Sequence, residues 1–117
     1  MKIGIVGQGY VGTAVKDVFQ KHYDIETYDI NKSLSSTKTI KDLVKLVDLI
    51  FVCVPTPMNP DGSCNTFSVK KVISQIDNVR NKRCSIVAIK STVSPGTTES
   101  LNKKCKSIKV VFNPEFL

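Results

Sequence analysis

The feature that most limits the fold of this chain is a group of three glycines near its start. Gly7, Gly9 and Gly12 form a GxGxxG pattern directly after the apolar segment Lys2–Val6, and apolar residues at helical spacing follow them. Gly7 permits a tight turn, Gly9 lets the backbone approach a ligand, and Gly12 allows close packing of helix on strand. Such a turn presents helix N–H groups to a pyrophosphate. The residues expected to contact a dinucleotide here are Gly7, Gly9, Tyr10, Val11 and Gly12.

A second short strand, Asp24–Tyr28, ends at Asp29, about 20 residues beyond the glycine turn. A carboxylate at this place accepts hydrogen bonds from the adenosine ribose hydroxyls and repels a 2′-phosphate, so NAD is the expected cofactor. Lys32 is close enough in sequence to contact the cofactor as well. The alternative is that Asp29 only shapes the turn before Asn31.

Apolar periodicity alternates between two and 3.6 along the rest of the chain, which is typical of alternating strands and helices. Further strands are predicted over 48–54, 85–89 and 109–112; helices are predicted from the stripes Ile40, Leu43, Val44, Val47 and Val69, Val72, Ile73, Ile76, and over 96–104. Ser35, Ser36 and Thr37 are candidate caps of the second helix. This order predicts an α/β fold of the Rossmann type. We expect a doubly wound parallel sheet of about five strands in the order 3-2-1-4-5, one domain over residues 1–117, and a ligand crevice beside the first strand.

Composition argues against several other classes of protein. The net charge is +7, but the lysines are spread over every segment and only 7% of residues are aromatic, so we expect no specific nucleic-acid binding. The longest apolar run is too short to span a membrane and no secretory signal opens the chain, so a cytoplasmic protein is expected. The cysteines, which are Cys53, Cys64, Cys84 and Cys105, form no CxxC pair and have no histidine nearby, so no metal site is expected.

Three further segments follow predicted strands, where a doubly wound sheet binds its ligands. They are Val54-Pro55-Thr56-Pro57, the segment 90–98 and Asn113-Pro114-Glu115-Phe116-Leu117. Together with the Gly-Tyr-Val-Gly turn, this set resembles the UDP-glucose/GDP-mannose dehydrogenase family. The resemblance covers the whole chain and matches only the N-terminal NAD-binding domain of that family. It implies oxidation of a nucleotide-sugar primary alcohol to a carboxylate by two hydride transfers to NAD⁺, through a cysteine thiolate that lies in a later domain.

The resemblance also implies roles for single residues. Val11 and Asp29 would hold the adenosine half of NAD, and Thr56 would line the cofactor crevice. Thr92 would lie near the nicotinamide and the reacting water, and Glu115 would reach the sugar nucleotide and help to position that water. The alternatives are that both threonines satisfy nearby backbone groups and that Glu115 is a solvated charge.

The chain departs from the family pattern in two ways. The stretch between Asp29 and the third strand is shorter than usual, and Leu34 stands near the family's lysine or arginine, which leaves Lys32 or Lys38 to replace it. The chain also ends before the sixth strand, the dimerisation helix and the domain with the catalytic cysteine. We therefore expect the isolated chain to be inactive, with a nucleotide sugar bound only through missing domains and with apolar surface through which copies could associate. The alternative is a stand-alone module that binds NAD(H) or a partner without catalysis.

Overall fold

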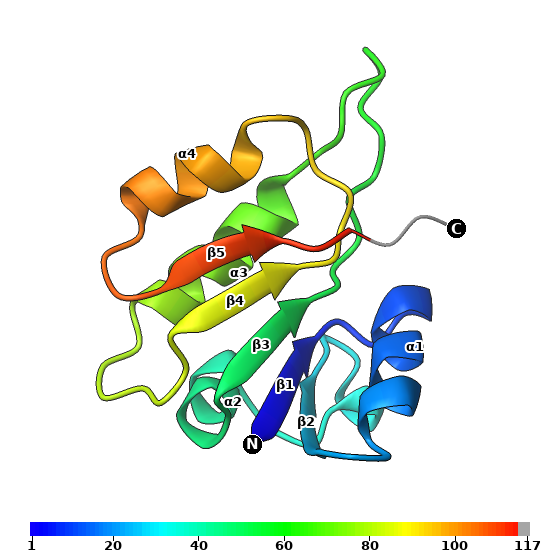
Figure 1. Ribbon diagram of the computed structural model, residues 1–117. Helices are drawn as coiled ribbons and strands as arrows, with labels where there is room; N and C mark the ends of the chain where they lie inside the picture. Colours follow the sequence, from blue (N-terminus) through cyan, green and yellow to red (C-terminus); the bar gives the residue numbers. More distant parts are fainter. Residues whose placement is uncertain (115–117) are drawn as a thin grey trace.

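The computed structural model describes residues 1–114 and contains a parallel sheet of five strands (Figure 1). The elements in chain order are β1 (Lys2–Val6), α1 (Tyr10–Phe19), β2 (Asp24–Tyr28), the 3-10 turn η1 (Lys32–Leu34), α2 (Ile40–Leu46), β3 (Leu49–Val52), α3 (Phe67–Asp77), β4 (Ile86–Ile89), α4 (Thr97–Lys104) and β5 (Lys109–Phe112). All four strand pairings are parallel, so the predicted α/β class is confirmed. The bounds of β1, β2 and β5 are those that the apolar pattern predicted.

The expected strand order 3-2-1-4-5 is wrong, because the sheet runs β2-β1-β3-β4-β5. The expected order would place the third strand outside β2. Instead β3 pairs with β1, with Ile5 opposite Phe51, on the side away from β2. Within the described chain, the segment 29–39 holds the η1 turn and no strand that could pair with β2.

A hydroxyl-rich segment covers the outer edge of β2 in place of a strand. Thr27 N–H donates to Ser36 Oγ at 2.8 Å, and Thr27 O accepts the backbone N–H groups of Ser36 and Thr37, each at 3.1 Å. Asp29 N–H donates to Ser35 Oγ at 2.7 Å. These bonds satisfy backbone groups on the outer edge of β2 that a neighbouring strand would otherwise satisfy.

The predicted cap of the second helix is therefore also wrong. Ser35, Ser36 and Thr37 bind β2, and α2 has Thr39 as its N-cap. The Thr39 hydroxyl accepts the Asp42 N–H at 3.1 Å, which is the usual bond of an N-cap threonine.

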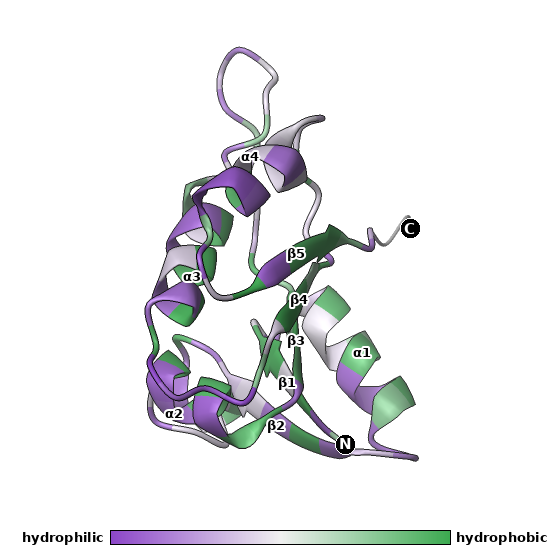
Figure 2. Cartoon of the chain, turned by 60° about the vertical axis from the view of Figure 1, so that its left-hand side comes forward, coloured by the Kyte–Doolittle hydropathy of each residue, from purple (hydrophilic) through white to green (hydrophobic). Residues whose placement is uncertain are grey.

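The helices form two unequal layers. The α1 helix covers one face of the sheet, while α2, α3 and α4 cover the other (Figures 1 and 2). The chain moves one way along the sheet from β1 to β2 and the opposite way from β2 to β5, and right-handed crossovers then place the helices on opposite faces. The predicted apolar stripe of α3 is buried throughout. In α1, Val15 is buried, whereas Val18 is exposed.

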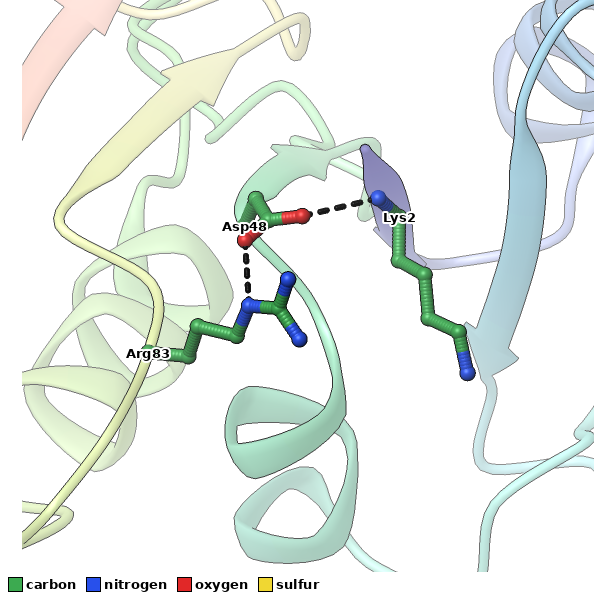
Figure 3. Close-up of polar contacts among 3 residues, drawn as sticks. All are labelled: Lys2, Asp48 and Arg83. Carbon is green, nitrogen blue, oxygen red and sulfur yellow. Dashed lines mark hydrogen bonds and ion pairs between the residues drawn. The ribbon is translucent and has the colours of Figure 1, made fainter.

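The amino-terminal edge of the sheet is held by Asp48, in the turn between α2 and β3 (Figure 3). Its carboxylate accepts the Lys2 N–H at 2.8 Å and pairs with Arg83 Nε at 2.5 Å, and its own N–H donates to Lys2 O at 2.8 Å. The hydrogen bond from the Lys2 N–H is the main cause that lowers the pKa of Asp48, and Arg83 adds to it. Asp48 thus links the start of β1 to the segments before β3 and β4.

The opposite edge, where the strands end, carries the loops that matter for ligand binding. The glycine turn follows β1, and residues 53–57 and 90–92 follow β3 and β4. The crossovers change direction between β1 and β3, which is the switch point where doubly wound sheets bind ligands. Among residues 1–114, no helix has the length and apolar content that a membrane crossing requires.

Candidate nucleotide-binding groove

A groove of about 630 Å³ opens at the switch point, at the carboxyl ends of β1, β3 and β4. It is lined by Gly7, Gly9, Tyr10, Val11, Asp29, Ile30, Cys53, Val54, Pro55, Thr56, Lys90, Ser91 and Thr92. The groove brings together almost all of the residues that the sequence nominated for cofactor binding. They come from four separate segments of the chain.

The three glycines of the turn meet different surroundings. Gly7 has a φ of +96°, and a Cβ on it would lie 2.7 Å from Cys53 O; a Cβ on Gly12 would lie 1.8 Å from Gly7 O. Both positions therefore need glycine for the fold itself. A Cβ on Gly9 would meet nothing within 4 Å, so the space above Gly9 belongs to the groove. Gly12 does not line the groove and acts in helix–strand packing.

The first turn of α1, which lies beside this space, has backbone N–H groups without a partner inside the helix. The first helical bond runs from Thr13 N–H to Gly9 O at 3.0 Å, so the N–H groups of Tyr10, Val11 and Gly12 precede it. No side chain within residues 1–114 caps this end, and the first turn contains no acidic residue. The positive end of the helix dipole is thus available to an anion.

Asp29 is half-buried at the end of β2 and braces the glycine turn. One carboxylate oxygen accepts the Gln8 N–H at 2.7 Å, and the other accepts the Asn31 N–H at 2.8 Å. An ionised carboxylate has about four acceptor sites, so two of them stay open to ligand hydroxyls. The two roles weighed for Asp29, turn residue and ribose acceptor, are therefore compatible.

The sequence analysis named only some of the groove residues that follow β3 and β4. Thr92 is exposed and lines the groove, and Thr56 lies half-buried on the loop after β3 and also lines it. Lys90 also lines the groove, and its Nζ donates to Asn113 Oδ1 at 2.8 Å. Ser91 was missed: it is buried, and its hydroxyl donates to Val54 O at 2.6 Å, which ties the ends of β3 and β4 together.

Ile30 was also missed by the sequence analysis. It is 91% exposed and lines the groove directly after Asp29, near Pro55. An apolar side chain with so little cover is suited to contact an apolar part of a ligand. The sequence feature that could have identified Ile30 is the presence of an apolar residue in an otherwise polar turn.

A second nominated residue, besides Gly12, does not line the groove. Lys32 lies outside it: its Nζ donates to Lys38 O at 2.7 Å and sits 5.4 Å from the centroid of the Tyr28 ring. Glu115 lies outside the described residues, so its predicted role stays a prediction.

The four cysteines form no disulfide within the described chain. Cys53 is buried directly after β3, and Cys64 lies in the loop before α3. Burial raises the pKa of Cys84 to about 11 and also raises the pKa of Cys105. These two thiols stay protonated at neutral pH, which makes them poor nucleophiles. Residues 1–114 contain no group of three or more histidine, cysteine, aspartate or glutamate side chains placed to hold a metal ion.

Comparison with known proteins points to one enzyme family. The sequence profile of the UDP-glucose/GDP-mannose dehydrogenase family, NAD binding domain, matches residues 25–117. The whole chain is 31% identical to a UDP-glucose 6-dehydrogenase of Streptococcus pneumoniae and 33% identical to one of Campylobacter jejuni, and it spans only 36% and 37% of their lengths. A UDP-glucose dehydrogenase structure from Pyrobaculum islandicum superposes on 99% of the chain with a TM-score of 0.84 and 25% identity, over 36% of that protein.

Proposed function

The chain belongs to the UDP-glucose/GDP-mannose dehydrogenase family, of which it forms the NAD-binding domain, and from this premise we propose that it serves a nucleotide-sugar 6-dehydrogenase. The proposed reaction oxidises the C6 alcohol of a nucleotide sugar such as UDP-glucose to a carboxylate. The observation that carries this proposal is the groove in which the open α1 end, the space above Gly9 and the Asp29 carboxylate face one ligand position.

The residues of the groove fit NAD in charge and in size. A volume of about 630 Å³ falls in the range of about 300–1000 Å³ that is usual for small-molecule sites. The N–H groups of α1 suit the pyrophosphate, and the open acceptor sites of Asp29 suit the ribose hydroxyls. When bound, NAD⁺ accepts a hydride from the alcohol carbon.

We propose that Asp29 makes the site selective for NAD over NADP. A 2′-phosphate would stand beside the ionised carboxylate and repel it, and Asp29 cannot turn away without releasing the Gln8 and Asn31 N–H groups. Ile30 and Pro55 would cover the adenine with apolar surface.

The wall after β4 would serve the nicotinamide end. Thr92 is proposed to lie near the nicotinamide and the reacting water, with Glu115 positioning that water. Ser91 orients Thr92 by tying the β4 end to Val54. The nucleophile for the second oxidation would come from outside these residues, because burial and raised pKa values disfavour thiolates at Cys84 and Cys105.

Self-association is a further part of the proposal. Ile86 and Val111 lie on the face of the sheet that carries Ala88, beyond the reach of α1, and their side chains are 45% and 36% exposed. Apolar surface of this kind favours packing against a second copy or against another part of a longer protein. A catalytically silent NAD-binding module is the competing function, and it would use the same groove.

Calorimetric titration of the chain with NAD⁺ and with NADP⁺ tests the cofactor assignment. We expect NAD⁺ to bind and NADP⁺ to bind at least about tenfold more weakly, because a carboxylate about 4 Å from the 2′-phosphate would oppose its binding by more than about 1.4 kcal/mol. Equal affinities would remove the proposed role of Asp29. No binding of either cofactor would reject the groove as the site.

A further inference from the structure

The α2 and α3 helices pack side by side (Figure 2). A second cavity, of about 780 Å³, is lined by residues of both helices. Its walls are the end of β2, the η1 turn, α2, and the carboxyl end of α3 with the turn 78–81 that follows. No residue lines both this cavity and the nucleotide groove.

The lining of this cavity is strongly cationic. Five basic side chains surround it, which are Lys32, Lys38, Lys41, Lys45 and Arg80, and no lining residue is acidic. The ion pairs found within residues 1–114 lie elsewhere, between Asp48 and Arg83 and between Glu99 and Lys103. Like charges gathered around a hollow without counter-charges create a positive potential that attracts anions.

One wall of the cavity is held in place by hydrogen bonding. Lys32 Nζ donates to Lys38 O at 2.7 Å and lies over the Tyr28 ring, so η1 is fastened to the start of α2. Lys41 and Lys45 are one helical turn apart on α2 and therefore project from the same side. Across the cavity, the amide side chains of Asn78 and Asn81 supply further donors beside Arg80.

We propose that this cavity binds a compact ligand with two or more phosphoryl groups, at a site distinct from the NAD groove. An arginine fork and several lysine ammonium groups suit clustered phosphoryl oxygens, and the volume is that of a small-molecule site. A nucleic-acid strand fits less well. Tyr28 is the only aromatic residue that lines the cavity, and Lys32 Nζ lies over its ring, so the cavity has no row of aromatic rings on which successive bases could stack.

The test is calorimetric titration of the whole chain with inorganic tripolyphosphate, in the presence of saturating NAD⁺ and at low ionic strength. The double variant Lys41→Gln, Lys45→Gln removes two cavity charges, and the double variant Lys104→Gln, Lys106→Gln removes two exposed charges elsewhere as a control. We expect the cavity variant to lower the affinity for tripolyphosphate about tenfold or more, since each lost charge-assisted contact lowers the affinity for an anion several-fold. The control variant should change it less than twofold, and neither variant should change NAD⁺ affinity.

Three results would overturn the proposal. Equal losses in both double variants would mean that only net charge matters. Competition between tripolyphosphate and NAD⁺, with no effect of the cavity variant, would place the anion in the nucleotide groove. If a single-stranded oligonucleotide bound more tightly than tripolyphosphate, with an affinity that increased with its length, the cavity would be part of a nucleic-acid surface instead. Urea unfolding of each variant confirms that a lost affinity is not a lost fold.

Discussion

The Asp29 carboxylate accepts the Gln8 N–H at 2.7 Å, so the end of β2 and the glycine turn after β1 are bonded together before any ligand binds. The same carboxylate holds the Asn31 N–H with its other oxygen. This pair of bonds fixes the position of the carboxylate at the groove. Asp29 therefore shapes the turn and lines the groove at the same time.

Replacement of Asp29 should separate these two effects. Asp29→Ala removes both bonds and the proposed ribose contacts, and we expect NAD⁺ affinity to fall about tenfold or more, since bonds to a charged group contribute about 1.5–3 kcal/mol. Asp29→Asn keeps one acceptor for the Gln8 N–H, so its loss of stability should be the smaller of the two. Calorimetry and urea unfolding measure these changes. Unchanged NAD⁺ affinity in Asp29→Ala would show that the carboxylate serves the turn alone.

Gly9→Val should abolish NAD⁺ binding while the fold persists. The added side chain meets no protein atom within 4 Å at Cβ, so it fills groove space and not core space. Ala14→Val, at an exposed position of α1 outside the groove, is the matched control and should bind NAD⁺ as the parent chain does. Circular dichroism reports the fold. Retained binding in Gly9→Val would place the pyrophosphate away from this turn.

Local patterns predicted the elements of this fold well. The strand Lys2–Val6 and the buried stripe of α3 follow from periodicity, because periodicity reports which face of an element is buried. The position of β3 beside β1 could not be predicted in this way, since sheet order depends on which strand edges stay open. Here the hydroxyls of Ser35 and Ser36 close the edge of β2.

The groove was more predictable than the cationic cavity. The glycine turn and Asp29 belong to a known spacing, so their meeting at the switch point follows from the fold class. Lys32, Lys45 and Arg80 are far apart in sequence, and their charges looked evenly spread. Only the packing of α2 against α3 brings them to one cavity.

Asp48 should make stability depend on pH in the acidic range. Its pKa is lowered in the folded chain, mainly by the Lys2 N–H, so its contribution is complete above the ordinary carboxyl pKa and is lost as pH falls through the lowered folded value. Asp48→Asn should lower the urea midpoint at neutral pH and leave variant and parent closer together at acidic pH. Arg83→Gln should keep most of the pH dependence, because the Lys2 bond remains. A constant difference between Asp48→Asn and the parent at all pH values would contradict this assignment.

Asn102 protects the open edge of β5. Its amide donates to Val110 O and accepts the Val110 N–H, both at 2.8 Å, so it pairs with this edge residue as a neighbouring strand would. Asn102→Ala leaves both backbone groups without these partners, and we expect a loss of about 1–2 kcal/mol in the free energy of unfolding. Asn102→Asp keeps the acceptor and loses only the donor, so its loss should be smaller. Urea unfolding tests both, and an unchanged midpoint in Asn102→Ala would mean that water replaces the amide.

The isolated chain should produce no NADH from UDP-glucose and NAD⁺. The first hydride transfer needs a bound nucleotide sugar, which we expect further domains to hold, and the second needs a thiolate beside the substrate carbon, since covalent catalysis depends on the deprotonated form of the thiol. Burial raises the pKa of Cys84 to about 11, and Cys53 is buried at the end of β3. Absorbance at saturating NAD⁺ measures NADH directly, and a variant with all four cysteines replaced by serine is the control. Turnover that disappears with one cysteine would identify that thiol as the nucleophile. Turnover that survives in the serine variant would show a reaction that needs no thiol. The chemistry would then depend on other residues of the groove.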